Sequence, residues 1–552
     1  MGKMFHKSLT LFLILTVISH VNSQPDNRYD PFDWVLYRQL GEITSITKGF
    51  AYIYIGTESG GVVRIQRIGH NLEEPLTTAQ GLKSNYISAV HFDRYTGNLW
   101  ITAGNYIHSS HSREGNWYIN NMDEWGLPNQ TKIIRMGSSP NYVWIQTGSG
   151  YIKLDHISGI YLGTYTYPDN EKIYWNSSWL YPEFDMNKLN EYSLSNGWML
   201  VGGSAVNPSG RDLRITVFYI GPDGDVVLGL TDGTIFVGDN RLRFLDPVTA
   251  GLGNNDVQFI LDEKTFIIGG RLSSKTIGFT YFDHRRGFLE ISGFDENINL
   301  TTGPYYCAVR VGEEIWYGGN EMIAVHNEKD AFWRTLDETR GFSGSIITAL
   351  EADSEFVWIA SSSGISRLNQ RNKRENPLGF EKMFKYVYIY DIELVNNQLW
   401  IASDYDLNIV DLSEERVLNF KRLGSLGNLA GMENVLTGFK VLALYNNEIM
   451  VSTKHGIWSY NFSTKSWIEL VDASVFGGGE ILAMTRYKKY IFLATNDGFI
   501  RYDIKDRFIS DYYYDFIGEI HDMKVDKKHL WLGTSNGLIK FKWTKDLKIL
   551  KY

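Results

Sequence analysis

The chain has 552 residues, of which 43% are hydrophobic, 14% aromatic and 21% charged, and its formal net charge is −9. This composition is too apolar for a disordered protein, and the acidic balance argues against a protein that binds nucleic acid through a basic face. The single cysteine, Cys307, excludes an internal disulfide and a cysteine-rich metal site, and its apolar neighbours predict an inert thiol in a buried strand.

The first 23 residues have the layout of a secretory signal peptide. Lys3 and Lys7 precede a mostly apolar run from Leu9 to Ile18, which a short polar stretch separates from Gln24. The run is shorter than the roughly 20 residues that a transmembrane helix needs. We therefore expect export to the periplasm or the exterior, cleavage before Gln24, and a mature chain without an integral membrane segment.

One motif recurs eleven times along the rest of the chain. It is an apolar triplet, often with Trp at its centre, and it is usually followed by a small residue, a turn and a second strand pattern. The central residues of the eleven copies are Tyr54, Trp100, Trp144, Val227, Ile267, Trp316, Trp358, Trp400, Met450, Phe492 and Trp531. An apolar strand pattern also precedes the triplets, as at 87–92 and 347–350.

The spacing of the copies predicts the architecture. Apart from one step of 83 residues, between Trp144 and Val227, successive copies are about 43 residues apart. Four strands and their connections come to this length, and such a repeat is typical of a β-propeller blade. A continuously apolar triplet fits an inner strand that is covered on both faces by neighbouring blades. We predict an all-β fold, a β-propeller with about eleven four-stranded blades.

Eleven blades exceed the usual four to eight of one ring, so we expect two tandem propellers of six and five blades. The first would span residues 24–335 and the second residues 336–552. One large ring or an open arc is the alternative. The segment 33–40 contains an isolated strand pattern, Trp34 to Tyr37. We expect this strand to pair with the strand near Phe541, which closes a ring and ties the two termini together.

The step of 83 residues contains an insertion at about 156–214. It is dense in aromatic residues, which include Trp175 and Trp179. Exposed rings can stack on sugars or on apolar partners, so these two residues are candidate ligand contacts. The alternative is that the insertion covers the edge of a blade and packs its rings inward.

The triplet and its turn resemble the two-component regulator propeller repeat, Leu-Trp-Ile-Gly-Thr followed by Gly-Leu and Arg-Tyr-Asp. Leu530 to Phe541 and Tyr490 to Asp503 are the most similar stretches, whereas the copies centred on Val227, Ile267 and Met450 lack the Trp. The resemblance covers almost all of the mature chain. It implies a propeller of the kind found in extracytoplasmic sensors and in stand-alone secreted bacterial proteins, and we expect the stand-alone form without the sensor's transmembrane helix and kinase.

The sequence contains no zinc-binding His-Glu-x-x-His helix, no phosphate loop and no Gly-x-Ser-x-Gly elbow. In a propeller the turns after the triplets emerge around one mouth of the channel, and here they carry varied polar residues. We predict ligand-binding residues in these turns and in the insertion: Asp232, Arg271, Asn320, Asp404, His455, Asp497, Trp175 and Trp179. The same turns also carry Glu58, Asn105, Lys454 and Asn536. Solvated turns without a ligand are the alternative.

We therefore expect an exported, non-enzymatic propeller that binds an unknown protein or carbohydrate as a sensor-like or scaffold protein. No cofactor and no metal site is predicted. One alternative is a propeller enzyme that acts on glycans through a pair of carboxyl groups brought together by folding. The other is a structural component of an envelope or secretion assembly.

Overall fold

The structure is a computed structural model that describes residues 28–127, 131–181, 186–261, 265–272, 278–283, 288–293, 303–342 and 345–549. The expected signal peptide lies outside these residues. Within them, no helix is long and apolar enough to cross a membrane.

The described strands form eleven antiparallel blades, and each blade contains one copy of the triplet motif. The predicted all-β propeller architecture is confirmed. The triplet lies on the second strand from the inner edge of its blade, not on the innermost strand. Its side chains are nevertheless buried on both faces. In a blade that lies between two others, the second strand is also covered by both neighbouring blades.

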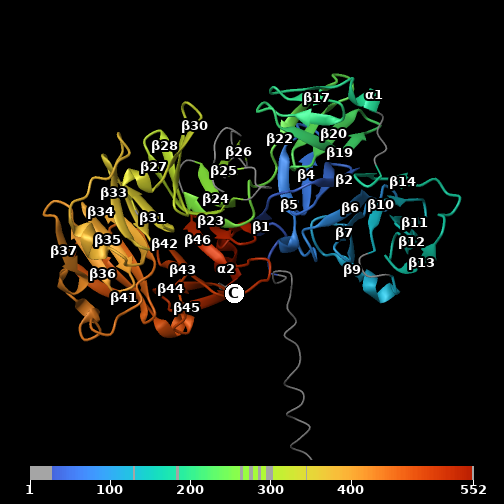
Figure 1. Cartoon of the computed structure of the whole chain (residues 1–552). Coiled ribbons are helices and arrows are strands. Elements are labelled where there is room, and N and C mark those ends of the chain that lie inside the picture. The colour runs from blue at the N-terminus through green and yellow to red at the C-terminus, as the bar shows by residue number, and fades with distance from the viewer. Residues whose placement is uncertain are drawn as a thin grey trace, which may run out of the picture.

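Figure 1 shows two groups of blades, one coloured blue to green and the other green to red. The first group has four blades, formed by β2 (Ile43–Lys48), β3 (Tyr52–Thr57), β4 (Val62–Gln66) and β5 (Leu72–Leu76); β6 (Ile87–Phe92), β7 (Leu99–Ala103), β8 (Tyr106–Ser110) and β9 (Tyr118–Asn121); β10 (Ile133–Ser138), β11 (Tyr142–Thr147), β12 (Gly150–Asp155) and β13 (Tyr161–Tyr165); and β19 (Asp212–Ile220), β20 (Asp225–Leu230), β21 (Ile235–Asp239) and β22 (Phe244–Val248). The insertion before β19 contains β14 (Tyr174–Trp175), β15 (Ser177–Ser178), α1 (Met186–Leu189), β16 (Ser193–Leu194), β17 (Met199–Val201) and β18 (Ser204–Val206).

The second group has seven blades. They are formed by β23 (Val257–Leu261), β24 (Phe266–Leu272), β25 (Gly278–Asp283) and β26 (Phe288–Gly293); β27 (Gly303–Val311), β28 (Glu314–Gly319), β29 (Ile323–Asn327) and β30 (Phe332–Leu336); β31 (Ile347–Ala352), β32 (Phe356–Ser361) and β33 (Gly364–Asn369); β34 (Ile389–Val395), β35 (Gln398–Ser403), β36 (Leu407–Asp411) and β37 (Arg416–Asn419); β38 (Leu442–Tyr445), β39 (Glu448–Thr453), β40 (Gly456–Asn461) and β41 (Ser466–Asp472); β42 (Ala483–Tyr487), β43 (Tyr490–Thr495), β44 (Gly498–Asp503) and β45 (Phe508–Tyr512); and β46 (Ile520–Val525), β47 (Leu530–Thr534), β48 (Gly537–Phe541) and β1 (Trp34–Tyr37). Helix α2 (Thr544–Ile549) follows the last blade.

The seven blades form a closed ring. Their inner strands β23, β27, β31, β34, β38, β42 and β46 contact one another in this order, and β46 contacts β23. The inner strands of the other group contact one another in the order β19, β2, β6 and β10. The division therefore lies near residue 250 and gives four and seven blades, which differs from the expected six and five with a boundary near 335. Repeat spacing is the same within and between rings, so it does not reveal which inner strands meet.

The strand expected to close a ring is β1, the outermost strand of the last blade. Trp34 lies opposite Phe541 in an antiparallel ladder, and their rings stack with centroids 3.8 Å apart. The third strand of each of the last two blades begins with a glycine, and the absence of a side chain there lets the backbone of the fourth strand come close. A Cβ at Gly498 would collide with the Tyr512 carbonyl oxygen, and one at Gly537 would collide in the same way with that of Tyr37. Thus β1 occupies the place of a regular fourth strand.

Part of the insertion fills the axis of the four-blade group. Strand β14 pairs with the inner strand β10, and β15 pairs with the inner strand β2. Between them, Asn176 is buried; its side chain accepts a hydrogen bond from the Met136 N–H at 2.9 Å and donates to the Val90 carbonyl, also at 2.9 Å. The insertion thus joins the inner edges of three blades.

The Trp residues at the centres of the triplets are structural. Trp100, Trp144, Trp316, Trp358, Trp400 and Trp531 are at most 1% exposed. The ring of Trp400 packs against the next blade, with centroid distances of 5.7 Å to Tyr460 and 5.9 Å to Trp467. These contacts hold adjacent blades together.

Removing residues 24–37 from a chain that begins at residue 24 should destabilise the ring strongly. The deletion strips a strand from the last blade together with the buried Trp34, whose truncation alone costs about 3–5 kcal/mol. Chemical denaturation measures the effect, and removal of residues 24–27 alone is the control. Equal denaturation midpoints for the two truncated chains would refute the closing role of β1.

Trp400→Ala should lower the free energy of unfolding by about 3–5 kcal/mol, through lost transfer energy and the cavity left between two blades. Tyr405→Ala is a matched control in the same blade, because the Tyr405 side chain is 79% exposed. Its effect should stay below about 0.5 kcal/mol. A loss below about 1 kcal/mol for Trp400→Ala would contradict a role in packing blades together.

Candidate functional site

The predicted turn residues are divided between the two groups of blades. Asp232, together with Glu58 and Asn105, belongs to the four-blade group. The others lie where the second strands of the ring blades end: Arg271, Asn320, Asp404, Lys454, His455, Asp497 and Asn536. In the part of the chain that the structure describes, no hydrogen bond or ion pair joins two of the eight predicted site residues. They therefore do not form one compact cluster.

Arg271 belongs to a polar network at the mouth of the ring. Its Nε lies 3.5 Å from Asp256 Oδ2, and His521 Nε2 lies 3.2 Å from Asp256 Oδ1. Burial acts to raise the pKa of Asp256, but hydrogen bonds from His521 and Gln258 outweigh it and lower the pKa below its ordinary value. Asp256 is thus an anion that binds Arg271, His521 and Gln258 at the mouth of the ring.

Tyrosines adjoin this network. The pKa of Tyr306 is raised by burial and by Tyr388 and Asp256, while Arg271 opposes the rise, so Tyr306 lies within electrostatic reach of these three groups. The rings of Tyr388 and Tyr390 are 4.8 Å apart. Side chains from β24, β27 and the start of β34 therefore lie near one another at one mouth.

Asp404 anchors the tyrosine pair. The Tyr390 hydroxyl donates to Asp404 Oδ1 at 2.6 Å, and this bond, followed by burial, raises the pKa of Tyr390 to about 12. Lys440 Nζ lies 4.8 Å from the centroid of the same ring. Nearby, the side chains of Tyr386 and Tyr405 are each 79% exposed. The mouth therefore presents both ordered and accessible tyrosine rings, and sequence reasoning missed all of them.

The remaining predicted turn residues in the ring make local contacts. Asn320 forms an isolated backbone bridge with Ile346, and the His455 N–H donates to Thr453 Oγ1 at 3.1 Å. Asp497 is an exposed turn residue. These three residues lie on the same side of the ring as Arg271 and Asp404 but do not join their network.

Asp232 lies in a cleft at the seam between the two groups of blades. Two adjoining cavities of about 470 and 550 Å³ share Glu58, Ser59 and Tyr86 in their walls. Asp232 lines the larger one. Arg38 lines the smaller one, donating to the Ser59 carbonyl at 2.7 Å and to that of Asn536. The cleft contains carboxylate and cationic side chains but no pronounced excess of either.

The two predicted tryptophans of the insertion do not form an open platform by themselves. Trp179 packs against the apolar core of the four-blade group. Trp175 is half-buried, and the Arg135 guanidinium lies 4.4 Å from the centroid of its ring. The inward packing of Trp179 agrees with the alternative interpretation of the insertion, although it covers inner strands and not an outer edge.

Acidic side chains gather around the axis of the ring. Burial and then the charge of Glu393 raise the pKa of Asp391 to about 8, and burial raises that of Glu393 to about 7. The pKa of Glu351 is raised by burial and by both of these groups, and Lys524 opposes the shift in all three. Because Lys524 lies on β46, across the ring from β31 and β34, the four side chains must converge toward the axis. In the sequence, these carboxyl groups are indicated only by the alternation of acidic and apolar residues in Asp391-Ile392-Glu393.

Asp391 also has a structural role. Its Oδ2 accepts the Leu442 N–H of the next blade at 2.8 Å, and Asp522 Oδ2 accepts the Ile260 N–H at the same distance. These carboxyl groups tie neighbouring inner strands together. Among the described residues, no group of three His, Cys, Asp or Glu side chains is placed to hold a metal ion.

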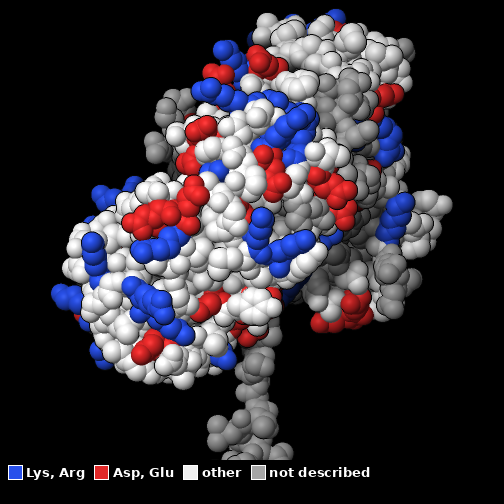
Figure 2. Space-filling view, turned by 60° about the vertical axis from the view of Figure 1, so that its left-hand side comes forward, with Lys and Arg blue, Asp and Glu red and all other residues white. Residues whose placement is uncertain are grey.

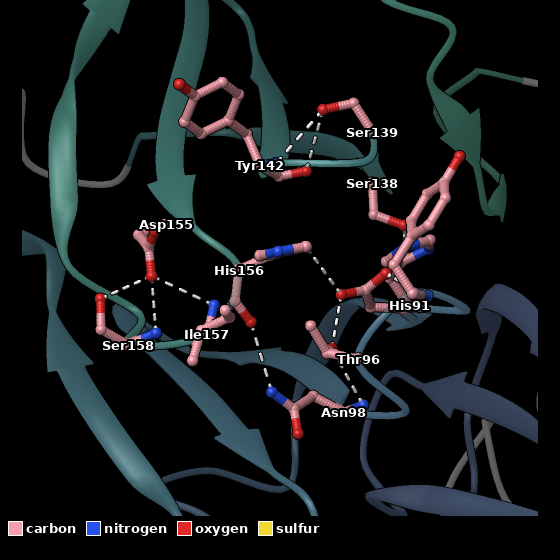
Figure 3. Close-up of polar contacts among 12 residues, drawn as sticks. His91, Thr96, Asn98, Ser138, Ser139, Tyr142, Asp155, His156, Ile157 and Ser158 are labelled. Atoms are coloured by element: carbon pink, nitrogen blue, oxygen red, sulfur yellow. Dashed lines mark hydrogen bonds and ion pairs between the residues drawn. The ribbon is translucent and has the colours of Figure 1, made fainter.

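A serine–histidine pair joins the second and third blades (Figure 3). His91 Nε2 lies 2.9 Å from Ser138 Oγ, and both residues are at most 3% exposed. Burial lowers the pKa of His91 to about 4, so the ring is neutral at pH 7. Asp93 binds Thr96 and pairs with His156 at 3.4 Å. The arrangement fixes inner strands, because a substrate has no access to the serine.

Cys307 lies on the inner strand β27 and is half-buried, whereas the sequence predicts a buried strand there. Its pKa is raised by burial, and its Sγ lies 3.9 Å from the Ile347 carbonyl oxygen of the next blade. A thiol with a raised pKa is protonated at neutral pH and is a poor nucleophile.

The carboxyl groups at the axis should make the ring less stable as pH rises. A carboxyl group whose pKa is raised by folding binds its proton more tightly in the folded state. Its contribution to stability is present below the unfolded pKa and is lost as pH rises through the folded values near 7 and 8. Glu393→Gln should therefore flatten the fall in unfolding free energy between pH 5 and pH 8, and should stabilise the ring at pH 8 by on the order of 1 kcal/mol.

Denaturant titrations at the two pH values measure this difference. Lys524→Met should steepen the fall, because it removes the cation that favours the charged carboxylates. Glu414→Gln is the control, since the Glu414 side chain is 58% exposed on the same blade as Glu393. Parallel pH profiles for Glu393→Gln and the wild type would contradict the assignment.

No protein-family model matches the chain, and no curated protein matches it. Among solved structures, one similar chain is the extracellular domain of a protein described as a one-component system of B. thetaiotaomicron, with 15% identity, a TM-score of 0.42, and coverage of 88% of this chain and 74% of that one. PorZ, a surface component of the type-IX secretion system of Porphyromonas gingivalis, has 12% identity and a TM-score of 0.30 over 92% and 87% of the two chains. The computationally designed Ika8 protein has 15% identity and a TM-score of 0.36 over 59% and 95%. At these identities the likeness concerns the fold alone.

Proposed function

We propose that the chain is an exported, non-enzymatic binding protein that holds a ligand or a protein partner at the tyrosine-lined mouth of its seven-bladed ring. The observation that carries this proposal is the pair of rings of Tyr388 and Tyr390, which Asp404 holds by a hydrogen bond. Tyr306, on another blade, lies within electrostatic reach of Tyr388 and Arg271. Tyr and Arg are enriched where proteins bind partners, because they combine apolar area with directional polar groups. The signal-peptide pattern at the start of the sequence supports export.

The charge distribution fits a ligand that is not a polyanion. On the face in Figure 2, Lys and Arg side chains are interspersed with Asp and Glu side chains. Sequence-independent binding of nucleic acid needs a continuous basic surface, which this face lacks. A sensor-like or scaffold role is therefore favoured over nucleic-acid binding.

A specific observation favours one alternative, a propeller enzyme that acts on glycans. Glu351 and Glu393 are carboxyl groups with raised pKa values that interact across adjacent inner strands. A carboxyl group that keeps its proton near neutral pH can serve as a general acid in glycoside hydrolysis. We rank this reading second because these inner-strand carboxyl groups adjoin Asp391, whose hydrogen bond to the next blade is structural.

A binding experiment tests the proposal. The mature chain is immobilised and probed with soluble peptidoglycan fragments and with a glycan array, and Tyr386→Ala and Tyr405→Ala are compared with the wild type. Loss of a stacking ring should weaken binding by on the order of tenfold. Phe332→Ala is the control, because Phe332 is 60% exposed after the β29–β30 turn, on the opposite side of the ring.

Equal weakening by the control, or binding that ignores both tyrosine variants, would overturn the placement at this mouth. Release of reducing sugar from a bound glycan, abolished by Glu393→Gln, would favour the enzyme instead.

A further inference from the structure

The third blade, β10–β13, ends the row of four blades. Inner-strand contacts run from β19 through β2 and β6 to β10, so β10–β13 and β19–β22 are the two terminal blades of this group. The core around β19–β22 includes residues from the insertion, among them Leu189, Tyr192 and Leu194. The side of β10–β13 that faces away from β6–β9 has a different composition.

Strand alternation separates the two faces of this blade. Val143, Ile145, Ile152 and Leu154 form the apolar core shared with the second blade. The residues between them point to the other side of the sheet, since successive side chains of a strand alternate. We call this side the aromatic face, and its rings belong to Tyr142, Trp144, Tyr151, Tyr165, Trp175 and Tyr181.

Two cations on the aromatic face, Lys153 and Arg135, are held by contacts within it. Lys153 Nζ lies 3.6 Å from the centroid of Tyr142 and forms an ion pair with Asp169 at 2.5 Å. The Arg135 guanidinium lies 3.8 Å from the centroid of Tyr181, and its Nε donates to Gln146 Oε1 at 2.7 Å. These contacts fix the orientation of the rings, and they engage both cations, so that neither is left for a charged ligand.

Several of these rings are accessible. Tyr165 is 38% exposed and Tyr181 is 42% exposed, and Tyr167, just beyond β13, is 78% exposed. Residues 157–168, which include the edge strand β13, contain no charged side chain. The accessible groups are therefore ring faces and phenolic, hydroxyl and backbone groups, together with the Asp169 carboxylate, which is 42% exposed and paired with Lys153.

We propose that the aromatic face binds a neutral oligosaccharide. Planar rings stack on the apolar C–H faces of sugar rings as they do on bases, and the phenolic and amide groups supply neutral hydrogen bonds to hydroxyls. The face offers no exposed cation to an anionic ligand, because Lys153 is paired with Asp169 and Arg135 is buried beside the rings of Trp175 and Tyr181. The site lies on a different group of blades from the ring mouth, so it stands or falls independently of the function proposed there.

Isothermal titration of the mature protein with maltohexaose and with cellohexaose tests the proposal, because these neutral hexasaccharides differ in linkage geometry. At least one should bind, and the double variant Tyr165→Ala/Tyr181→Ala should weaken its binding by on the order of tenfold or more. Tyr118→Ala is the matched control, because Tyr118 is 50% exposed on the neighbouring blade but lies outside the aromatic face. This variant should bind like the wild type.

Three results would overturn the proposal. The first is no binding of either hexasaccharide at millimolar concentration, and the second is equal weakening by Tyr118→Ala. The third is a dimer in light scattering that the double variant dissociates, because the face would then be covered by a second copy of the chain. Thermal denaturation of each variant verifies that it is folded; surface substitutions of this kind change stability by about 0.5 kcal/mol or less.

Discussion

The ladder between β1 and β48 is the constraint on which the seven-bladed ring depends. The first and last blades of a propeller meet, and here the last blade is completed on its outer edge by a strand from the other end of the chain. Val35 and Tyr37 of this strand share an apolar core with Val257 and Phe266 of the first blade of the ring. The stacked rings of Trp34 and Phe541 bury this junction at the centre of an aromatic cluster. With the last blade complete, the inner strands of all seven blades surround one axis, and their turns surround one mouth.

The blade count and the closing strand could be predicted because both are local patterns. A triplet such as Leu399-Trp400-Ile401 is apolar because it is buried between two blades, and each blade contains one such triplet, so the number of triplets predicts the number of blades. The grouping into four and seven blades could not be predicted, since it depends on which inner strands meet across the axis. Those contacts are made by residues far apart in the sequence, such as β23 with β46.

The candidate site shows the same limit. Arg271 and Asp404 could be selected because the turns after the triplets share one side of the ring. Tyr388 and Tyr390 could not be predicted as site residues, because they lie at the start of an inner strand. An aromatic residue at such a position is indistinguishable in sequence from a core residue. The insertion was ambiguous for a related reason: Trp175 and Trp179 are four residues apart, yet one lies beneath a guanidinium and the other in an apolar core.

The four-blade group lies within the chain between β1 and β23, and this placement has a consequence for assembly. Its first and last residues meet at the seam, where the Leu252 N–H donates to the Arg38 carbonyl at 3.0 Å. Domains generally fold in the order in which they are synthesised. Once the four blades have formed, they present β1 beside the start of the ring, although β48 has not yet been made. Pairing β1 with β48 then closes a loop that consists of the ring segment alone, because the residues of the four blades are already ordered, so the entropic cost of the pairing is lower. The folded four-blade group thus holds β1, the last strand of the ring, next to the position at which the first blade of the ring forms.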